Sequence, residues 1–150
     1  MEIRKILWPT DFSASAKNAL DYVKSITERY GPEIHVLYVI EDIAHHKEWY
    51  GKFDPAHVEK LVEWENQKAD ERLEQICSRH LENCPLYIRH IRVGDPAQEI
   101  LKLIDDEKID MVVMSTKGTK GHFQFGSVAD KVVKNATIPV LTIPVNNQSG

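Results

Sequence analysis

The chain has 150 residues, 42% of them hydrophobic and 28% charged, a composition typical of one globular domain and not of a disordered segment. Nineteen basic and 23 acidic residues give a net charge of -4, which argues against bulk attraction to nucleic acid or to an anionic membrane. No apolar stretch reaches the roughly 18 residues of a transmembrane helix, and the amino terminus lacks a signal-peptide pattern, so we expect a cytoplasmic protein.

The first forty residues predict strand, helix, strand. Residues 3–8 are predicted as a strand that Pro9 closes, and Ser13 is placed to cap a helix that runs to about residue 29. Gly31-Pro32 breaks this helix. Residues 34–40 are almost all apolar or β-branched, so we expect a second strand that is covered on both faces.

The middle of the chain predicts one long helix and a third strand. Residues 41–53 are irregular; Asp54-Pro55 then starts a helix that runs to about residue 80. One stripe of this helix is apolar and consists of Val58, Leu61, Val62, Ala69, Leu73, Ile76 and Cys77. Residues 86–93 are predicted as a strand that carries Arg89, His90 and Arg92.

A further helix and the most informative stretch follow. Asp95 and Gln98 are placed as a capping box, before a buried face of Ile100, Leu101 and Ile104. The stretch from Asp110 to Val145 then predicts a strand at 111–114, a glycine loop, a helix and a fifth strand. The loop glycines are Gly118, Gly121 and Gly126, and the helix carries Val128, Val132 and Val133. We assign residues 1–145 to one domain and 146–150 to a loose tail.

Five strands that alternate with four helices predict an α/β fold, a single parallel sheet wound on both faces. The third strand carries charges and the fifth carries Pro139 and Pro144, so both belong at edges. With right-handed crossovers, the strand order 3-2-1-4-5 satisfies these constraints. The winding then reverses between the first and fourth strands, where ligands of open α/β sheets bind.

Residues at this reversal are suited to an anion. The first strand ends at Pro9, Thr10 and Asp11, and the fourth ends at Ser115 and Thr116 before the glycine loop. Backbone N–H groups of such a loop, with the start of the next helix, attract a phosphate. Ser127 is placed to cap that helix. Glycines also form ordinary turns, and Asp11 is equally explained as a polar residue near a helix start.

The chain resembles the universal stress protein (UspA-like) family over essentially its whole length. The resemblance rests on ILWPTDFS, VLYVIE, VGDPAQEI and the stretch VVMSTKG to FGSVADKVVKNATIPVLTIP. It implies a Rossmann-like domain, of the adenine nucleotide α-hydrolase-like type, that binds ATP, with or without Mg²⁺, and forms a homodimer. Members that bind ATP carry a spaced glycine motif. Here Met114 aligns before its first glycine, Ser115 replaces that glycine, and Gly118 and Gly126 fill the later positions.

The resemblance also implies a role for each motif residue. Adenine lies near Asp11 and Val39, while Pro9 and Thr10 shape the turn. The phosphates are then held by Gly118, Gly126, Ser127 and Val128. The loop between Gly118 and Gly126 has seven residues, two fewer than in the family motif.

Several residues have simpler interpretations. Lys117 and Lys120 are expected to be solvated, and the adjacent His45 and His46 are expected at the surface and not in a metal site. Trp49, Tyr50 and Trp64 are expected as packing or lid residues, because no basic groove accompanies them. Cys77 and Cys84 are expected as two ordinary thiols.

Three functions remain open from the sequence. The first is a regulatory protein of the stress response that binds ATP and acts through protein contacts. The second is a slow ATP hydrolase or nucleotide-processing enzyme, although no Walker Lys-Ser/Thr follows a strand and no general base stands in the loop. The third is a dimeric scaffold without nucleotide, favoured by Ser115 and the shortened loop. We expect the homodimer to form through residues 138–145, an apolar strand at a sheet edge.

Overall fold

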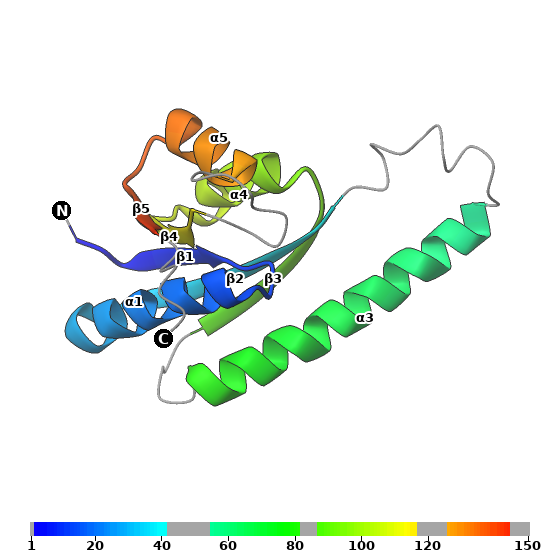
Figure 1. Ribbon diagram of the computed structural model, residues 1–150, viewed down its shortest axis with the longest axis horizontal. Helices are drawn as coiled ribbons and strands as arrows, with labels where there is room; N and C mark the ends of the chain where they lie inside the picture. The colour runs from blue at the N-terminus through cyan, green and yellow to red at the C-terminus, as the bar shows by residue number, and fades with distance from the viewer. Residues whose placement is uncertain (1, 42–54, 82–86, 117–125, 145–150) are drawn as a thin grey trace.

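The computed structural model describes residues 2–41, 55–81, 87–116 and 126–144 (Figure 1). In chain order the elements are β1 (Lys5–Pro9), α1 (Ala14–Tyr30), β2 (Glu33–Glu41), α3 (Pro55–His80), β3 (Tyr87–Gly94), α4 (Pro96–Glu107), β4 (Met111–Ser115), α5 (Ser127–Asn135) and β5 (Val140–Ile143). Within these ranges no helix is both long enough and apolar enough to cross a membrane.

The strands form one parallel sheet in the order β3-β2-β1-β4-β5, so the order predicted from charges and prolines is confirmed. β1 lies at the centre and pairs with β2 from Lys5↔Glu33 to Pro9↔Leu37. On its other side it pairs with β4 through Ile6↔Met111. Because the sheet is parallel, the carboxyl ends of β2, β1 and β4 lie side by side at the same end of the sheet.

Helices cover both faces of the sheet, which makes three layers (Figure 1). Side chains alternate along β1, so Ile6 and Trp8 pack with α1 and α3 while Leu7 packs with α4 and α5. The Trp8 indole N–H is buried and donates to the Ala16 carbonyl oxygen at 3.0 Å, which ties β1 to α1. This contact satisfies a polar atom that burial would otherwise leave unpaired.

The two helix caps predicted from the sequence at α1 and α4 are present. Ser13 Oγ accepts from the Ala16 N–H at 3.2 Å at the start of α1. Asp95 Oδ2 accepts from the Gln98 N–H at 3.0 Å at the start of α4. Each side chain satisfies one N–H of a first helical turn, a contact that contributes roughly 1 kcal/mol.

Three apolar faces differ from the predicted ones. In α4 Ile100 and Ile104 are buried as predicted, but Leu103 is buried in place of Leu101, which is only partly buried. In α5 Val132 is buried but Val133 is 47% exposed, because adjacent residues of a helix point about 100° apart. In α3 the carboxyl-terminal half packs on the sheet, whereas Leu61 is 48% exposed. The amino-terminal half of α3 extends past the edge of the sheet (Figure 1).

β5 is shorter than the predicted strand at 138–145 and covers Val140–Ile143. Pro139 and Pro144 flank it, and a proline has no N–H to donate to a ladder. Val140 and Ile143 pack against opposite faces of the sheet, as strand alternation predicts. Leu141 is 38% exposed.

The charges of the edge strand β3 pair with both neighbouring helices. Arg89 Nη1 lies 3.3 Å from Asp70 Oδ1 of α3. Arg92 Nη2 lies 3.1 Å from Asp106 Oδ2 of α4, on the other face. The alternation that hides apolar residues in central strands thus carries the two arginines to opposite helices.

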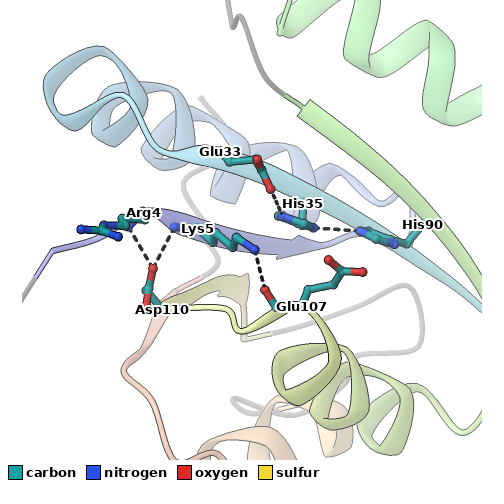
Figure 2. A network of polar contacts seen from close by, with 7 residues as sticks. All are labelled: Arg4, Lys5, Glu33, His35, His90, Glu107 and Asp110. Carbon is teal, nitrogen blue, oxygen red and sulfur yellow. Dashed lines mark hydrogen bonds and ion pairs between the residues drawn. The ribbon is translucent and has the colours of Figure 1, made fainter.

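Polar contacts join the elements at the amino ends of the central strands (Figure 2). Asp110 Oδ2, just before β4, accepts from the backbone N–H groups of Arg4 at 2.9 Å and Lys5 at 3.0 Å. Lys5 Nζ donates to the Glu107 carbonyl oxygen at 3.0 Å, at the end of α4. These contacts lie at the amino ends of the strands, opposite to the carboxyl ends where ligands of open α/β sheets bind, so they serve the fold.

Candidate functional site

Most of the residues expected to bind nucleotide are brought to the carboxyl ends of the three central strands and to the start of α5. They are Pro9, Thr10 and Asp11 at β1, Val39 on β2, Met114 and Ser115 on β4, and Gly126, Ser127 and Val128 at α5. Val39, Met114 and Val128 all contact the apolar cluster under α4 and α5. Gly118 lies outside the described residues, as do the other residues from 117 to 125.

The turn between β1 and α1 is held by short local hydrogen bonds. The Thr10 N–H donates to the Leu37 carbonyl oxygen at 2.8 Å, and Thr10 Oγ1 accepts from the Phe12 N–H at 3.1 Å. Asp11 Oδ1 accepts from the Ser13 N–H at 3.0 Å. One oxygen of the Asp11 carboxylate therefore has a structural partner, and Thr10 is nearly buried.

Phe12 adopts a φ of 65°, in the left-handed region that L-residues other than Asn and Asp rarely adopt. Its ring contacts Tyr38 of β2, with ring centroids 4.5 Å apart. Sequence reasoning missed this residue, because composition and periodicity carry no signal for a left-handed aromatic residue.

The start of α5 differs from the predicted one. Gly126 is the N-cap residue and Ser127 is the first helical residue, so the prediction that Ser127 caps this helix is wrong. No side chain caps α5. A capping side chain belongs to the N-cap residue, from which its oxygen accepts the N–H of the second or third helical residue. Ser127 follows that position by one residue.

The amino terminus of α5 is attached directly to the end of β4. The Gly126 N–H donates to the Thr116 carbonyl oxygen, and the Thr116 N–H donates to the Ile143 carbonyl oxygen of β5 at 3.1 Å. Thr116 is buried and fixes where the helix begins. The sequence indicates that Thr116 lies at a strand end, because it directly follows an apolar strand. The sequence does not indicate the contact of Thr116 with Gly126.

The first turn of α5 presents unused donors at this point. The Asp130 N–H donates to the Gly126 carbonyl oxygen at 3.0 Å and begins the helical pattern. The N–H groups of the three preceding residues, Ser127, Val128 and Ala129, have no acceptor among the described residues. Three such N–H groups and the helix dipole favour an anion.

The part of the chain that the structure describes holds no group of three His, Cys, Asp or Glu side chains arranged to bind a metal ion. His45, His46, Trp49 and Tyr50 lie outside that part. Trp64 lies on α3, 53% exposed, with Lys68 Nζ 3.9 Å from its ring centroid. Cys77 is a buried free thiol, and Cys84 lies outside the described residues.

The chain matches known proteins over nearly its full length. The family model of the universal stress protein family matches residues 2–144. Universal stress protein MJ0577 of Methanocaldococcus jannaschii is 32% identical over 157 aligned positions, which cover 96% of each chain. A solved structure of MJ0577 has a TM-score of 0.80 at 31% identity and covers 98% of this chain and 99% of that one.

Two further structures show the same fold. Universal stress protein UspA from Lactobacillus plantarum has a TM-score of 0.80 at 25% identity, covering 95% of this chain and 99% of that one. A universal stress protein from Archaeoglobus fulgidus, solved in complex with dAMP, has a TM-score of 0.65 at 21% identity, covering 95% and 99%. The family-model match and the identity to MJ0577 both extend over the strand ends and the start of α5. This chain belongs to the universal stress protein family.

Proposed function

We propose that this protein binds an adenine nucleotide, ATP in the first instance, and acts through nucleotide-dependent protein contacts and not through rapid catalysis. The observation that carries the proposal is the first turn of α5. It is fixed to the end of β4 by the Gly126–Thr116 hydrogen bond, it has no side-chain cap, and it lies where the winding of the sheet reverses.

The residues present fit a phosphate group. The N–H groups of Ser127, Val128 and Ala129 are unpaired donors among the described residues, and a phosphate offers several acceptor oxygens. Val39 and Met114 belong to one apolar cluster and supply apolar contacts for a nucleoside. The choice of adenine rests on the family resemblance and on the dAMP complex of the protein from Archaeoglobus fulgidus.

The backbone of Ser115 is compatible with this site. In the family motif a glycine stands here, and glycine is needed only where the backbone is left-handed or approaches a ligand closely. Ser115 lies in β4, paired with Ile143, and its φ is not positive. The backbone at this position is therefore one that any L-residue adopts.

The site gives little support to an enzyme. Asp11 is the acidic residue at the end of β1, and one of its carboxylate oxygens accepts from the Ser13 N–H in the turn. A general base must reach the proton that it removes. Hydrolysis of bound ATP is therefore expected to be slow or absent.

The variant Gly126→Val tests the site. The φ of -60° and ψ of 148° at Gly126 suit any L-residue, so the helix is retained while a branched side chain enters the space beside the first turn. Titration calorimetry is expected to show loss of ATP binding. Asn135→Val, an exposed substitution at the other end of α5, is the control and keeps native affinity. Native ATP affinity in Gly126→Val would place the nucleotide elsewhere.

We also propose that the protein forms a homodimer through β5. This strand is at an edge of the sheet and carries the exposed Leu141. An exposed apolar edge invites pairing, and the same strand of a second copy covers it with two-fold symmetry. Pro139 and Pro144 limit the ladder to a short, defined pairing.

A further inference from the structure

A cavity lies between α3 and the sheet, on the face opposite to the candidate nucleotide site. It has a volume of about 290 Å³ and occurs where the amino-terminal half of α3 leaves the sheet. Ile40 and Ala69, both buried, form its apolar floor. A volume of this size approaches those of small-molecule sites, roughly 300 Å³ and above.

Strand alternation separates this cavity from the nucleotide site. Val39 contacts the cluster under α4 and α5, while its neighbours Tyr38 and Ile40 face the cavity on the α3 side. Phe12 likewise lines the cavity, one residue after Asp11. The two sites therefore share backbone segments but present different side chains.

The wall of the cavity is aromatic. The rings of Phe12 and Tyr38 have centroids 4.5 Å apart and planes inclined by 36°. Both side chains are only partly buried, so some ring surface faces the cavity. Phe12 has a φ of 65°, and its ring lies against Tyr38 of β2. Such a wall favours a planar ring as ligand, through offset or edge contacts.

The rim carries an excess of positive charge. Lys68 and Arg72 of α3 line the cavity together with one carboxylate, that of Glu65. The Arg72 guanidinium lies 4.6 Å from the centroid of the Phe12 ring. Neither cation forms an ion pair with a described residue, whereas Arg89 of β3 pairs with two carboxylates of the same helix.

We propose that this cavity is a second ligand site, for a small planar aromatic anion such as an aromatic carboxylate or sulfonate. The rings of Phe12 and Tyr38 contact the aromatic part, and Arg72 and Lys68 bind the anionic group. A guanidinium suits both carboxylate and sulfonate because its N–H groups donate in parallel pairs. The site stands whether or not the protein binds nucleotide.

The fluorescent probe 8-anilinonaphthalene-1-sulfonate tests this site in the intact protein. We expect saturable binding of one probe per chain, weakened about tenfold or more in Arg72→Gln. Arg79→Gln, an exposed arginine near the far end of the same helix, is the matched control and keeps native affinity. Equal affinity in the two variants, or no saturable binding to the native protein, would overturn the proposal.

Two further arms identify the position and the charge requirement. The neutral analogue N-phenyl-1-naphthylamine has the same rings without the sulfonate, so it is expected to bind weakly and equally to the native protein and to Arg72→Gln. Saturating ATP is expected to leave the affinity for the sulfonate probe unchanged. Displacement of the probe by ATP would place the probe in the nucleotide site and overturn the proposal. If Arg72→Gln also weakened binding of the neutral analogue, the site would not require an anionic ligand, which would contradict the proposal.

Discussion

Glu33, His35 and His90 form a hydrogen-bonded row that joins β2 to β3 (Figure 2). His35 is fully buried, and its Nε2 lies 2.6 Å from Glu33 Oε1. Since a carboxylate only accepts, His35 Nε2 carries a proton, and His35 Nδ1 lies 2.9 Å from His90 Nε2, so one of these two nitrogens donates to the other. Two imidazolium rings would oppose donor to donor across this contact.

The row makes stability depend on pH through His90. Burial is the main cause that lowers the pKa of His90; His35 and Arg92 act in the same direction, and Glu107 opposes them. At pH values below about 6.5, the ordinary pKa of histidine, the unfolded state therefore binds more protons than the folded state. The free energy of unfolding is therefore expected to fall as the pH drops through that value and to level off below the folded-state pKa.

The variant His90→Gln tests this origin. Glutamine keeps a donor for His35 Nδ1 but does not titrate, so the variant is expected to lose less stability between about pH 7.5 and pH 5 than the native protein. Urea denaturation at both pH values measures the difference. An equal or larger loss in His90→Gln would show that other groups set the acid sensitivity.

At the scale of elements, local signals predict most of the helices and strands. Ser13 and Asp95 cap the helices that their sequence context indicates, and Gly31 ends α1 with a φ of 63° that suits glycine. The predicted start of α5 differs from the observed one by one residue, because Gly126-Ser127 offers two N-cap residues and only the hydrogen bond to Thr116 decides between them.

Burial along α3 is predicted less well, for a physical reason. The apolar stripe of this helix is continuous in sequence, yet among its residues whose burial the structure describes only Ala69, Leu73 and Cys77 are buried. A stripe indicates which side of a helix faces inward, but the length of the sheet beneath it decides how many turns are covered. Leu61 therefore lies exposed, although it belongs to the same stripe.

The proposed homodimer interface at the edge strand β5 can be tested by a substitution. Leu141→Lys places a charge on the proposed interface and is expected to convert a dimer of about twice 17.2 kDa into a monomer, measured by light scattering at micromolar concentration. Leu61→Lys, at another exposed leucine, is the control and leaves the dimer intact. A native protein that runs as a monomer would rule this interface out.

At the scale of the whole molecule, the sheet order follows from a few residues. The charges of β3 and the prolines around β5 assign two strands to the edges, and with right-handed crossovers the order 3-2-1-4-5 satisfies these constraints. The candidate site is located by the same reasoning, since the position of the reversal depends on topology alone. The contact of Thr116 with Gly126 could not be predicted, because it joins residues across a loop of nine positions.

Slow turnover is expected of the intact protein. The first turn of α5 supplies donors for an anion, but Asp11 shares its carboxylate with the turn that begins α1. Bound ATP is therefore expected to persist for many minutes, as measured by the release of phosphate from a stoichiometric complex. Steady hydrolysis at an ordinary enzymatic rate, on the order of 10 per second, would require a catalytic group other than Asp11 and the donors of the first turn of α5.

Titration calorimetry of ATP into the unmodified protein tests nucleotide binding most directly. The open first turn of α5, held at the end of β4, predicts one ATP per chain with millimolar or tighter affinity. The absence of binding in this range would contradict the account and would leave the chain as a universal stress protein that acts as a scaffold without nucleotide.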